Sequence, residues 1–205
     1  MKHALVILCG GNSVRMGTDK ALLPFGDSCL IEYLVREFSP YFSNIYLSVK
    51  RKGAYAHLDL DVTEIADIYP NAGPMSGLFS ALSMIHEDSA FFLSVDTPFF
   101  EPETALALFD KIGDTDICTL EHAAGSEEIP VGVYTKNIIT TIGKCLLLKK
   151  FTFQELVERC HVTYLSDEDF STETDTSLQK QLFNMDTRQD YYRALKLVLA
   201  VTDLS

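Results

Sequence analysis

Residues 8–20 combine two adjacent glycines, an arginine and a lysine just after an apolar run, and these residue types could together hold a chain of phosphates. Gly10 and Gly11 allow the backbone to turn sharply and to bring its amide groups close to an anion. Arg15 offers a planar pair of donors to phosphate oxygens, whereas Lys20 offers a single mobile charge. The segment is therefore predicted to bind the phosphates of a nucleoside triphosphate.

This loop fits neither of the two commonest phosphate-binding motifs. A P-loop carries Lys-Ser or Lys-Thr directly after its last glycine, whereas Thr18 and Asp19 separate Gly17 from Lys20. The dinucleotide fingerprint G-x-G-x-x-G is missing from the loop as well. Asp19 is expected to stabilise the loop rather than to bind a metal.

Two aspartates further along the chain are candidate ligands for a divalent cation. Asp96 directly follows the apolar residues 90–95, and Asp186 follows a Phe-Asn-Met segment near the end of the chain. Magnesium prefers hard oxygen ligands and typically takes one or two carboxylates from the protein. The alternatives are that Asp96 is a turn residue before Pro98, and that Asp186 is the N-cap of a final helix starting near Arg188, although an N-cap residue can also face a site.

The elements that must position these residues alternate along the chain. Strand signals occur at about 4–9, 45–49, 60–65, 90–95, 116–120, 131–135 and 161–165. Helical patterns lie between them and at the C-terminus, with apolar positions at Leu30, Tyr33, Leu34, Phe38, Leu78, Leu82, Ile85, Leu106, Phe109, Tyr191, Tyr192, Leu195, Leu197 and Leu199. The alternation predicts an α/β fold, a three-layer αβα sandwich around a mainly parallel, Rossmann-like sheet of about seven strands.

Such a topology would bring distant candidates to one edge of the sheet. Right-handed crossovers would place the loop after the first strand and Asp96 along the same carboxyl edge, where open α/β sheets bind ligands. Gly73, Pro74 and Gly77 predict a turn followed by a helix, whose amides either face an anion or ribose or merely connect a strand to a helix.

Size and composition limit the classes of protein to consider. The 205 residues suit a single domain over 1–205. The formal charge of −12, from 29 acidic and 17 basic residues, argues against nucleic-acid or membrane partners. The five cysteines form no C-x-x-C pair and indicate reduced thiols, so a cytoplasmic protein is expected. The first apolar run leads into the glycine loop and is expected to be a strand, not a signal peptide.

The first loop resembles that of the MobA-type nucleotidyltransferases, the molybdenum cofactor guanylyltransferases, whose signature is L-x-G-G-x-S-x-R-M-G-x-D-K. The matching residues are Leu8, Gly10, Gly11, Ser13, Arg15, Met16, Gly17, Asp19 and Lys20. Cys9 stands in place of the usual alanine, and a small buried residue is the favoured interpretation of this thiol.

Three later segments are similar to the same family in order and coarse spacing. Asp67 and residues 73–77 resemble its D…G-P-L-A-G segment, and residues 94–98 resemble its C-D-x-P metal-binding turn. Residues 184–190 resemble its N-x-N-T-P-E-D stretch, although Asp186 stands where asparagine is common and Arg188 replaces proline. Asp67 is either a nucleotide contact, as in the family, or a solvent-facing turn residue.

The resemblance implies a fold like that of the nucleotide-diphospho-sugar transferases and transfer of GMP from GTP to the terminal phosphate of molybdopterin or its molybdenum form, with pyrophosphate as the product. It implies Mg²⁺ as cofactor and transient contact with molybdoenzymes or their chaperones. Catalysis is then assigned to Arg15, Lys20 and Asp96, and metal binding to Asp96 and Asp186. The implied nucleotide-binding residues are Leu8, Cys9, Gly10, Gly11, Lys20, Asp67, Gly73 and Asp96.

Other functions compete with this interpretation. A cytidylyltransferase acting on the same pterin usually reads L-A-A-G in its first loop, so Gly10 favours guanine. A sugar-phosphate nucleotidyltransferase is a more distant rival, because the chain is short for that group. A non-catalytic carrier of nucleotide or pterin is a different class, and the presence of both Lys20 and Asp96 argues against it.

Overall fold

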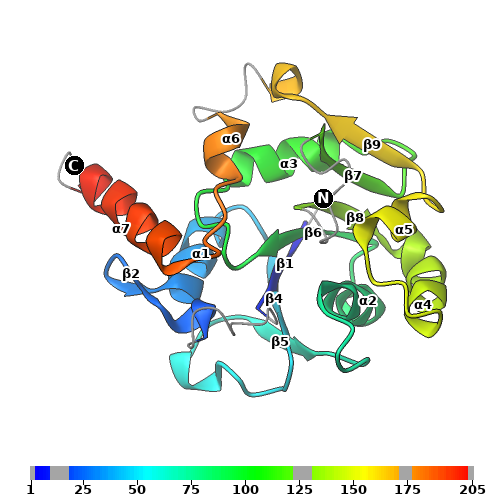
Figure 1. Cartoon of the computed structure of the whole chain (residues 1–205), viewed down its shortest axis with the longest axis horizontal. Helices are drawn as coiled ribbons and strands as arrows, with labels where there is room; N and C mark the ends of the chain where they lie inside the picture. The colour runs from blue at the N-terminus through cyan, green and yellow to red at the C-terminus, as the bar shows by residue number, and fades with distance from the viewer. Residues whose placement is uncertain (1–2, 10–18, 122–130, 171–176, 203–205) are drawn as a thin grey trace.

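The computed structural model describes residues 3–9, 19–121, 131–170 and 177–202. Within these residues a sheet of seven strands has the order β5-β4-β1-β6-β8-β7-β9 (Figure 1). The strands are β1 (Ala4–Leu8), β4 (Asn44–Val49), β5 (Thr63–Ala66), β6 (Ser89–Ser94), β7 (Ile117–Leu120), β8 (Gly132–Thr135) and β9 (Val162–Leu165). All of the predicted strand segments are thus confirmed, and most agree to within one or two residues.

The sheet is mainly parallel, as predicted. β1 pairs in parallel with β4 and β6, β4 with β5, and β7 with β9, whereas β8 runs antiparallel to both β6 and β7. Leu8 is in register with Ser48 on one side and with Ser94 on the other. The three central strands therefore end at the same level, where three chain connections leave the sheet together.

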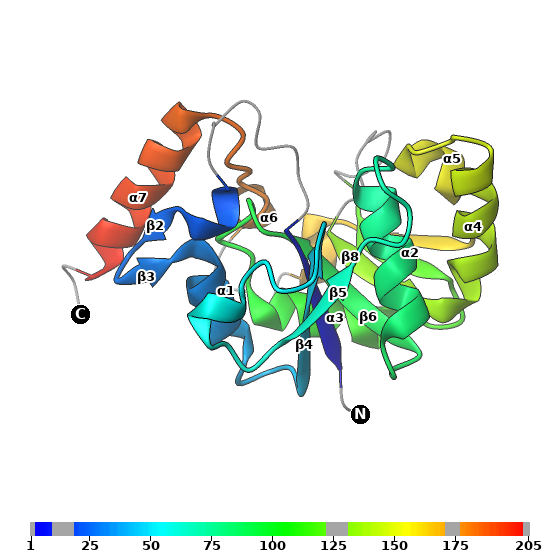
Figure 2. The same ribbon diagram turned by 90° about the horizontal axis from the view of Figure 1, so that it is seen from below.

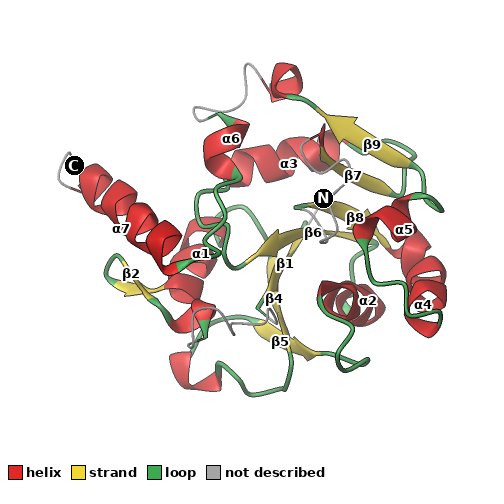
Figure 3. Ribbon diagram, viewed as in Figure 1, coloured by secondary structure: helices red, strands yellow, loops and turns green. Residues whose placement is uncertain are grey.

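Helices cover both faces of the sheet and form the predicted three layers (Figures 1 and 2). One face carries α1 (Leu30–Phe38), α3 (Pro102–Lys111), α6 (Leu178–Gln181) and α7 (Arg188–Thr202), and the other carries α2 (Pro74–Met84), α4 (Ile139–Leu147) and α5 (Phe153–Val157). Figure 3 shows these helices on either side of the strands. A helix with the length and hydrophobicity needed to span a membrane is not found in the described parts of the chain.

The alternating side chains of β1 show why both faces must be covered. Leu5 and Ile7 lie in the core beneath α1 and α3, whereas Ala4 and Val6 lie in the core beneath α2 and α4. All four side chains are fully buried. A strand with apolar residues on both faces is stable only between two layers of helices, which is the arrangement observed.

One predicted boundary was wrong. The strand expected at 60–65 begins only at Thr63, because Asp59 adopts a left-handed conformation with φ of 50° and the amide of Val62 donates to Leu60 O at 2.9 Å. This local turn prevents residues 60–62 from joining the ladder. The sequence prediction also lacked the ribbon of β2 (Pro24–Phe25) and β3 (Ser28–Cys29), which turns at Gly26 with a φ of +64°.

Short 3-10 helices complete the described elements, namely η2 (Lys20–Leu22), η3 (Ala56–Leu58), η5 (Lys136–Ile138) and η6 (Asp167–Phe170). Near the central strand ends, α2 approaches the sheet closely at Gly77. A Cβ atom at this position would lie 2.6 Å from Ser48 Oγ and 3.1 Å from Leu8 Cδ2. Glycine therefore lets α2 approach the ends of β1 and β4 this closely without displacing the side chains of Ser48 and Leu8.

Candidate active site

Three predicted site residues meet at the carboxyl edge of the sheet. The Nζ atom of Lys20 lies 2.7 Å from Asp96 Oδ2 and 3.3 Å from Asp186 Oδ1. Lys20 begins η2, Asp96 follows β6, and Asp186 precedes α7, so the fold brings together three segments that are remote in sequence. The cluster comprises one cation between two carboxylates.

Local hydrogen bonds position Lys20. Asp19 is the N-cap of η2, and its Oδ1 atom accepts from the amide of Ala21 at 3.0 Å. Ala21 is fully buried, which holds the short helix against the core. Burial lowers the pKa of Lys20, but the hydrogen bond and charge of Asp96, joined by those of Asp186, raise this pKa above its ordinary value. The lysine therefore remains a cation at neutral pH.

Asp96 is both a turn residue and a member of the cluster. The amide of Thr97 donates to Ser94 O at 3.1 Å, which closes the turn after β6. The hydroxyl of Ser94 donates to Asp96 Oδ1 at 2.5 Å, leaving the other carboxylate oxygen for Lys20. The two interpretations offered by the sequence are therefore compatible, and Ser94 is a supporting residue that the sequence analysis missed.

Asp186 does not cap the final helix. α7 begins at Arg188, and Thr187 and Asp190 form a reciprocal capping pair: the amide of Asp190 donates to Thr187 Oγ1 at 3.2 Å, and the amide of Thr187 donates to Asp190 Oδ2 at 2.9 Å. The N-cap alternative for Asp186 was therefore wrong. Its carboxylate instead contacts Lys20, although the side chain is 55% exposed.

Asp67 and Gly73 lie in the connection between β5 and α2. Burial raises the pKa of Asp67 to about 6, and the charge of Lys50 acts in the opposite direction. Gly73 precedes α2 with a φ of 58°, a conformation that side chains rarely adopt. Within the described part of the chain, no hydrogen bond or ion pair joins Asp67 or Gly73 to the Lys20 cluster. Their predicted nucleotide contacts stay predictions.

The remaining predicted nucleotide-binding residues belong to the end of β1 and the loop after it. Leu8 ends the strand, and the amide of Cys9 donates to Ser48 O at 3.0 Å. Burial raises the pKa of the Cys9 thiol well above its ordinary value, so the thiol stays protonated. Cys9 is only partly buried and packs against the core, so it is less enclosed than the sequence interpretation expected. The other predicted residues of the loop, Gly10, Gly11 and Arg15, lie outside the described residues.

The cluster has donors that suit a hard divalent cation. Asp96 and Asp186 already hold one positive charge between them, the ammonium group of Lys20. Among the described residues there is no group of three or more His, Cys, Asp or Glu side chains that could hold a metal. Two carboxylates alone would leave most coordination positions to water or to substrate phosphates, which is the common arrangement for magnesium.

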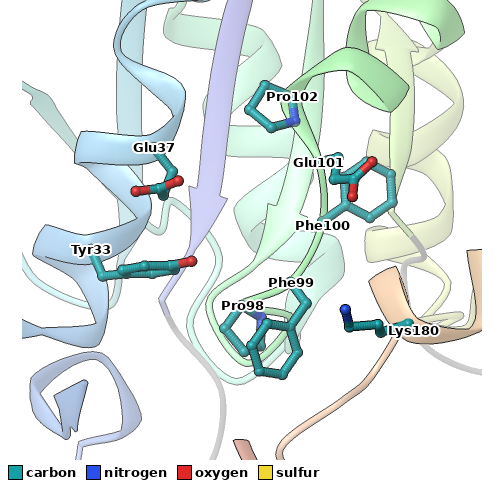
Figure 4. Close-up of a pocket in the computed structure, with 8 residues that line it drawn as sticks. All are labelled: Tyr33, Glu37, Pro98, Phe99, Phe100, Glu101, Pro102 and Lys180. Carbon is teal, nitrogen blue, oxygen red and sulfur yellow. The ribbon is translucent and has the colours of Figure 1, made fainter. Parts of the chain in front are cut away.

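A cavity of about 190 Å³ lies between α1, the connection from β6 to α3, and α6 (Figure 4). No sequence motif predicted this cavity, and none of the predicted site residues in the described part of the chain lines it. The ring of Phe99, on its wall, also contacts Phe25 and Phe183. The lining residues are Tyr33, Glu37, Pro98, Phe99, Phe100, Glu101, Pro102 and Lys180.

Comparison with known proteins identifies the family. Residues 5–163 match the model of the MobA-like NTP transferase domain. A protein named probable molybdenum cofactor guanylyltransferase from Carboxydothermus hydrogenoformans is 31% identical over 195 residues, which cover 94% of this chain and 95% of the relative. These matches confirm the resemblance seen in the sequence motifs.

Solved structures share the fold. Molybdopterin-guanine dinucleotide biosynthesis protein A from Archaeoglobus fulgidus matches with a TM-score of 0.81 and 22% identity, over 96% of this chain and 99% of that chain. The 2-C-methyl-D-erythritol 4-phosphate cytidylyltransferase from Thermus thermophilus matches with a TM-score of 0.68 and 14% identity, over 97% and 99%. Likeness of fold alone therefore does not identify the nucleotide. From the family model and the related sequence, the chain belongs to the family of MobA-like NTP transferase domains, which are nucleotidyltransferases.

Proposed function

We propose that this protein transfers GMP from GTP to the terminal phosphate of molybdopterin or its molybdenum form, releases pyrophosphate and forms a molybdopterin guanine dinucleotide. The observation that carries the proposal is the Lys20 cluster, with its ammonium group held 2.7 Å from Asp96 at the carboxyl edge of the sheet. The name of the related Carboxydothermus protein supports the choice of guanylyl transfer.

This reaction depends on positioning the two substrates and on stabilising negative charge, and not on proton transfer. The attacking group is a phosphate that is already ionised at neutral pH, so no general base is required. Negative charge grows on the leaving pyrophosphate as the bond to the α-phosphorus breaks, and a preorganised cation stabilises that charge. Lys20, which is protonated and held in place by Asp96, is suited to this role.

We further propose Mg²⁺ as the cofactor, with Asp96 and Asp186 as its protein ligands. When bound, the ion would supply positive charge beside the triphosphate. Arg15 is proposed as a second cation for the phosphates, and Leu8, Cys9, Gly10, Gly11, Asp67 and Gly73 as further nucleotide contacts. Lys20, Arg15 and the ion would together supply the local positive charge that a chain with a net charge of −12 needs to bind a polyanionic substrate.

The test is pyrophosphate release from GTP, CTP or ATP in the presence of magnesium and molybdopterin. GTP should give the highest kcat/KM, and omission of molybdopterin should abolish release. A higher kcat/KM with CTP would make the protein a cytidylyltransferase on the same pterin. Tight nucleotide binding in isothermal titration without pyrophosphate release would indicate a nucleotide carrier instead.

A further inference from the structure

A buried tyrosine contacts the helix cap that precedes the phosphate-binding lysine. Tyr55 lies in the connection between β4 and β5, immediately before η3, and is only 5% exposed. Its hydroxyl donates to Asp19 Oδ2 at 3.0 Å. This bond joins two segments that lie 36 positions apart in the sequence. Neither the family motifs nor the predicted site includes Tyr55.

Both carboxylate oxygens of Asp19, the acceptor of this bond, accept hydrogen bonds. Asp19 Oδ1 accepts from the amide of Ala21 at 3.0 Å and so caps η2, the short helix that Lys20 begins. Asp19 Oδ2 accepts from Tyr55. Because a carboxylate bound at both oxygens has little freedom to rotate, Tyr55 restricts the cap, and the cap restricts the first residue of η2.

The backbone of Tyr55 is itself fixed to the sheet. Glu64, on β5, accepts from the amide of Tyr55 at 2.6 Å and from the amide of Ala54 at 3.2 Å, and it also accepts from the amide of Gly53. Burial raises the pKa of Tyr55, so its hydroxyl stays protonated and remains a donor at neutral pH. A continuous chain of contacts therefore runs from β5 through Tyr55 and Asp19 to η2.

We propose that Tyr55 is a positioning residue for Lys20, which it orients through the side chain of Asp19. The proposal deepens, and rests on, the proposed nucleotidyl transfer. If Lys20 must meet the leaving pyrophosphate, a looser η2 lowers the rate of transfer while leaving the rest of the nucleotide site intact. The effect is expected mainly in kcat, because a preorganised contact matters most where charge develops.

Tyr55→Phe removes the hydroxyl and keeps the buried ring. We expect kcat for pyrophosphate release to fall about 10-fold, given that misplacement of a catalytic group by about 1 Å can cost about 10²-fold. KM for GTP should change by less than about 2-fold, as for an interaction made in the transition state only. Asp19→Asn tests the same link from its other side and should give a loss of the same kind.

Tyr46→Phe is the matched control. Tyr46 is also a buried tyrosine, 6% exposed, and its hydroxyl donates to a carboxylate, Glu87 Oε2, at 3.1 Å. It lies in the middle of β4, in register with Val6, and its hydroxyl bonds a residue that precedes β6, at the end of the sheet opposite the Lys20 cluster. Its variant should keep kcat, although it loses the same kind of hydrogen bond. A loss of kcat equal to that of Tyr55→Phe would show a general effect of stability and overturn the proposal.

A double-mutant cycle separates positioning from a merely structural role. If Tyr55 acts through Lys20, Tyr55→Phe should have almost no further effect on kcat in a Lys20→Ala protein. An equal slowing in both backgrounds, or unchanged kcat in the single variant, would overturn the proposal.

A second readout does not depend on turnover. The NMR signal of ¹³C-dimethylated Lys20, assigned by its loss in Lys20→Ala, should shift in Tyr55→Phe and stay in place in Tyr46→Phe. If the unmodified protein released no pyrophosphate, the proposed function would fail while this readout still judged the link to Lys20. An unshifted signal in Tyr55→Phe would overturn the link even in an active enzyme.

Discussion

Asp96 and Asp186 contact the same ammonium group, but the fold holds these two carboxylates by different means. The side chain of Asp96 is 16% exposed and receives a hydrogen bond from Ser94, whereas the side chain of Asp186 is 55% exposed. Charges that are partly withdrawn from water interact more strongly than exposed ones. Two residues of the same type around one lysine should therefore contribute unequally to the site.

The supporting structure explains the difference. Asp96 lies two residues after the central strand β6, and the residue between them is bonded to the neighbouring strand, since the amide of Val95 donates to Leu8 O at 3.2 Å. Asp186 depends on a docked C-terminal segment, in which the amide of Met185 donates to Asp96 O at 2.9 Å. Gln181, fully buried, exchanges two hydrogen bonds of 3.2 Å with Glu101. One aspartate is placed by the sheet and the other by a segment packed on it.

The largest effect is expected for Asp96→Asn, which keeps the size of the side chain and removes its charge. Pyrophosphate release with magnesium should fall by about 10²- to 10³-fold, the range seen when one preorganised electrostatic group is removed. The thermal midpoint should change little, because Phe91 and Leu93, which are fully buried, supply the core contacts of β6. Asp110→Asn, at an exposed position on α3, is the control. Full turnover with an unchanged magnesium dependence would place the metal site elsewhere.

Removal of Lys20, the partner that the two aspartates share, should have an effect of similar or slightly smaller size. Lys20→Ala is expected to slow single-turnover transfer at saturating GTP by about 2 to 4 kcal/mol in activation free energy, as for other preorganised electrostatic groups. GTP affinity, measured by titration, should change less, because the charge on pyrophosphate grows during the reaction. If Lys20→Ala slows the reaction more than Asp96→Asn does, the main role of Asp96 is to hold Lys20 in place. An unchanged single-turnover rate would remove Lys20 from the catalytic group.

Asp186→Asn should have a smaller effect than either. Water screens an exposed charge, so the carboxylate of Asp186 should attract the metal ion and Lys20 only weakly, and a loss of about 5-fold or less in kcat/KM is expected. The measurement is a magnesium titration of turnover beside that of Asp96→Asn. Equal losses in the two variants would show that the two carboxylates are equivalent ligands, and the comparison would then fail.

Asp67 is a third carboxylate for this comparison, because burial changes its pKa although it makes no contact with Lys20. Its pKa is raised to about 6 from an ordinary value of 3.8, so the native protein binds this proton more tightly than the unfolded chain does. Native stability should accordingly fall as the pH rises from about 4 to about 6. Asp67→Asn should therefore be more stable than the unmodified protein at pH 8, by less than about 1 kcal/mol for a half-buried group, and differ little at pH 4. Urea unfolding of both proteins at pH 4 and pH 8 measures the difference in their free energies of unfolding and so tests its sign.

Much of the site could be predicted because strand ends are visible in the sequence. Apolar runs before the glycine loop and before Asp96 predicted two parallel strands, and parallel topology alone brings their carboxyl ends together. The contact between Lys20 and Asp96 follows from that edge. α4, with the sequence ITTIGKCLL, was not predicted, because β-branched residues and Gly143 have low helix propensity. Its Ile142, Cys145 and Leu146 are buried, so tertiary packing stabilises this helix.

Side-chain partners were harder to predict. Asp186 and Thr187 are adjacent and both are common N-cap residues, so the sequence could not decide which one caps α7. The hydrogen bond from Tyr55 to Asp19 depends on how the connection after β4 folds back, and no local pattern reveals it. Spacing predicts where elements end, whereas the choice among nearby polar partners depends on the finished packing.

The close approach of α2 to the sheet limits which substitutions can be tolerated together at positions 48 and 77. Because a Cβ atom at Gly77 would lie 2.6 Å from Ser48 Oγ, the volumes available at these two positions are shared. Alanine at 77 would be accepted more readily if the side chain at 48 became smaller or turned its hydroxyl aside, and a larger side chain at 48 would have to turn away from α2 or move the helix. Substitutions at the two positions should therefore show epistasis, with each change tolerated or rejected according to the residue already present at the other.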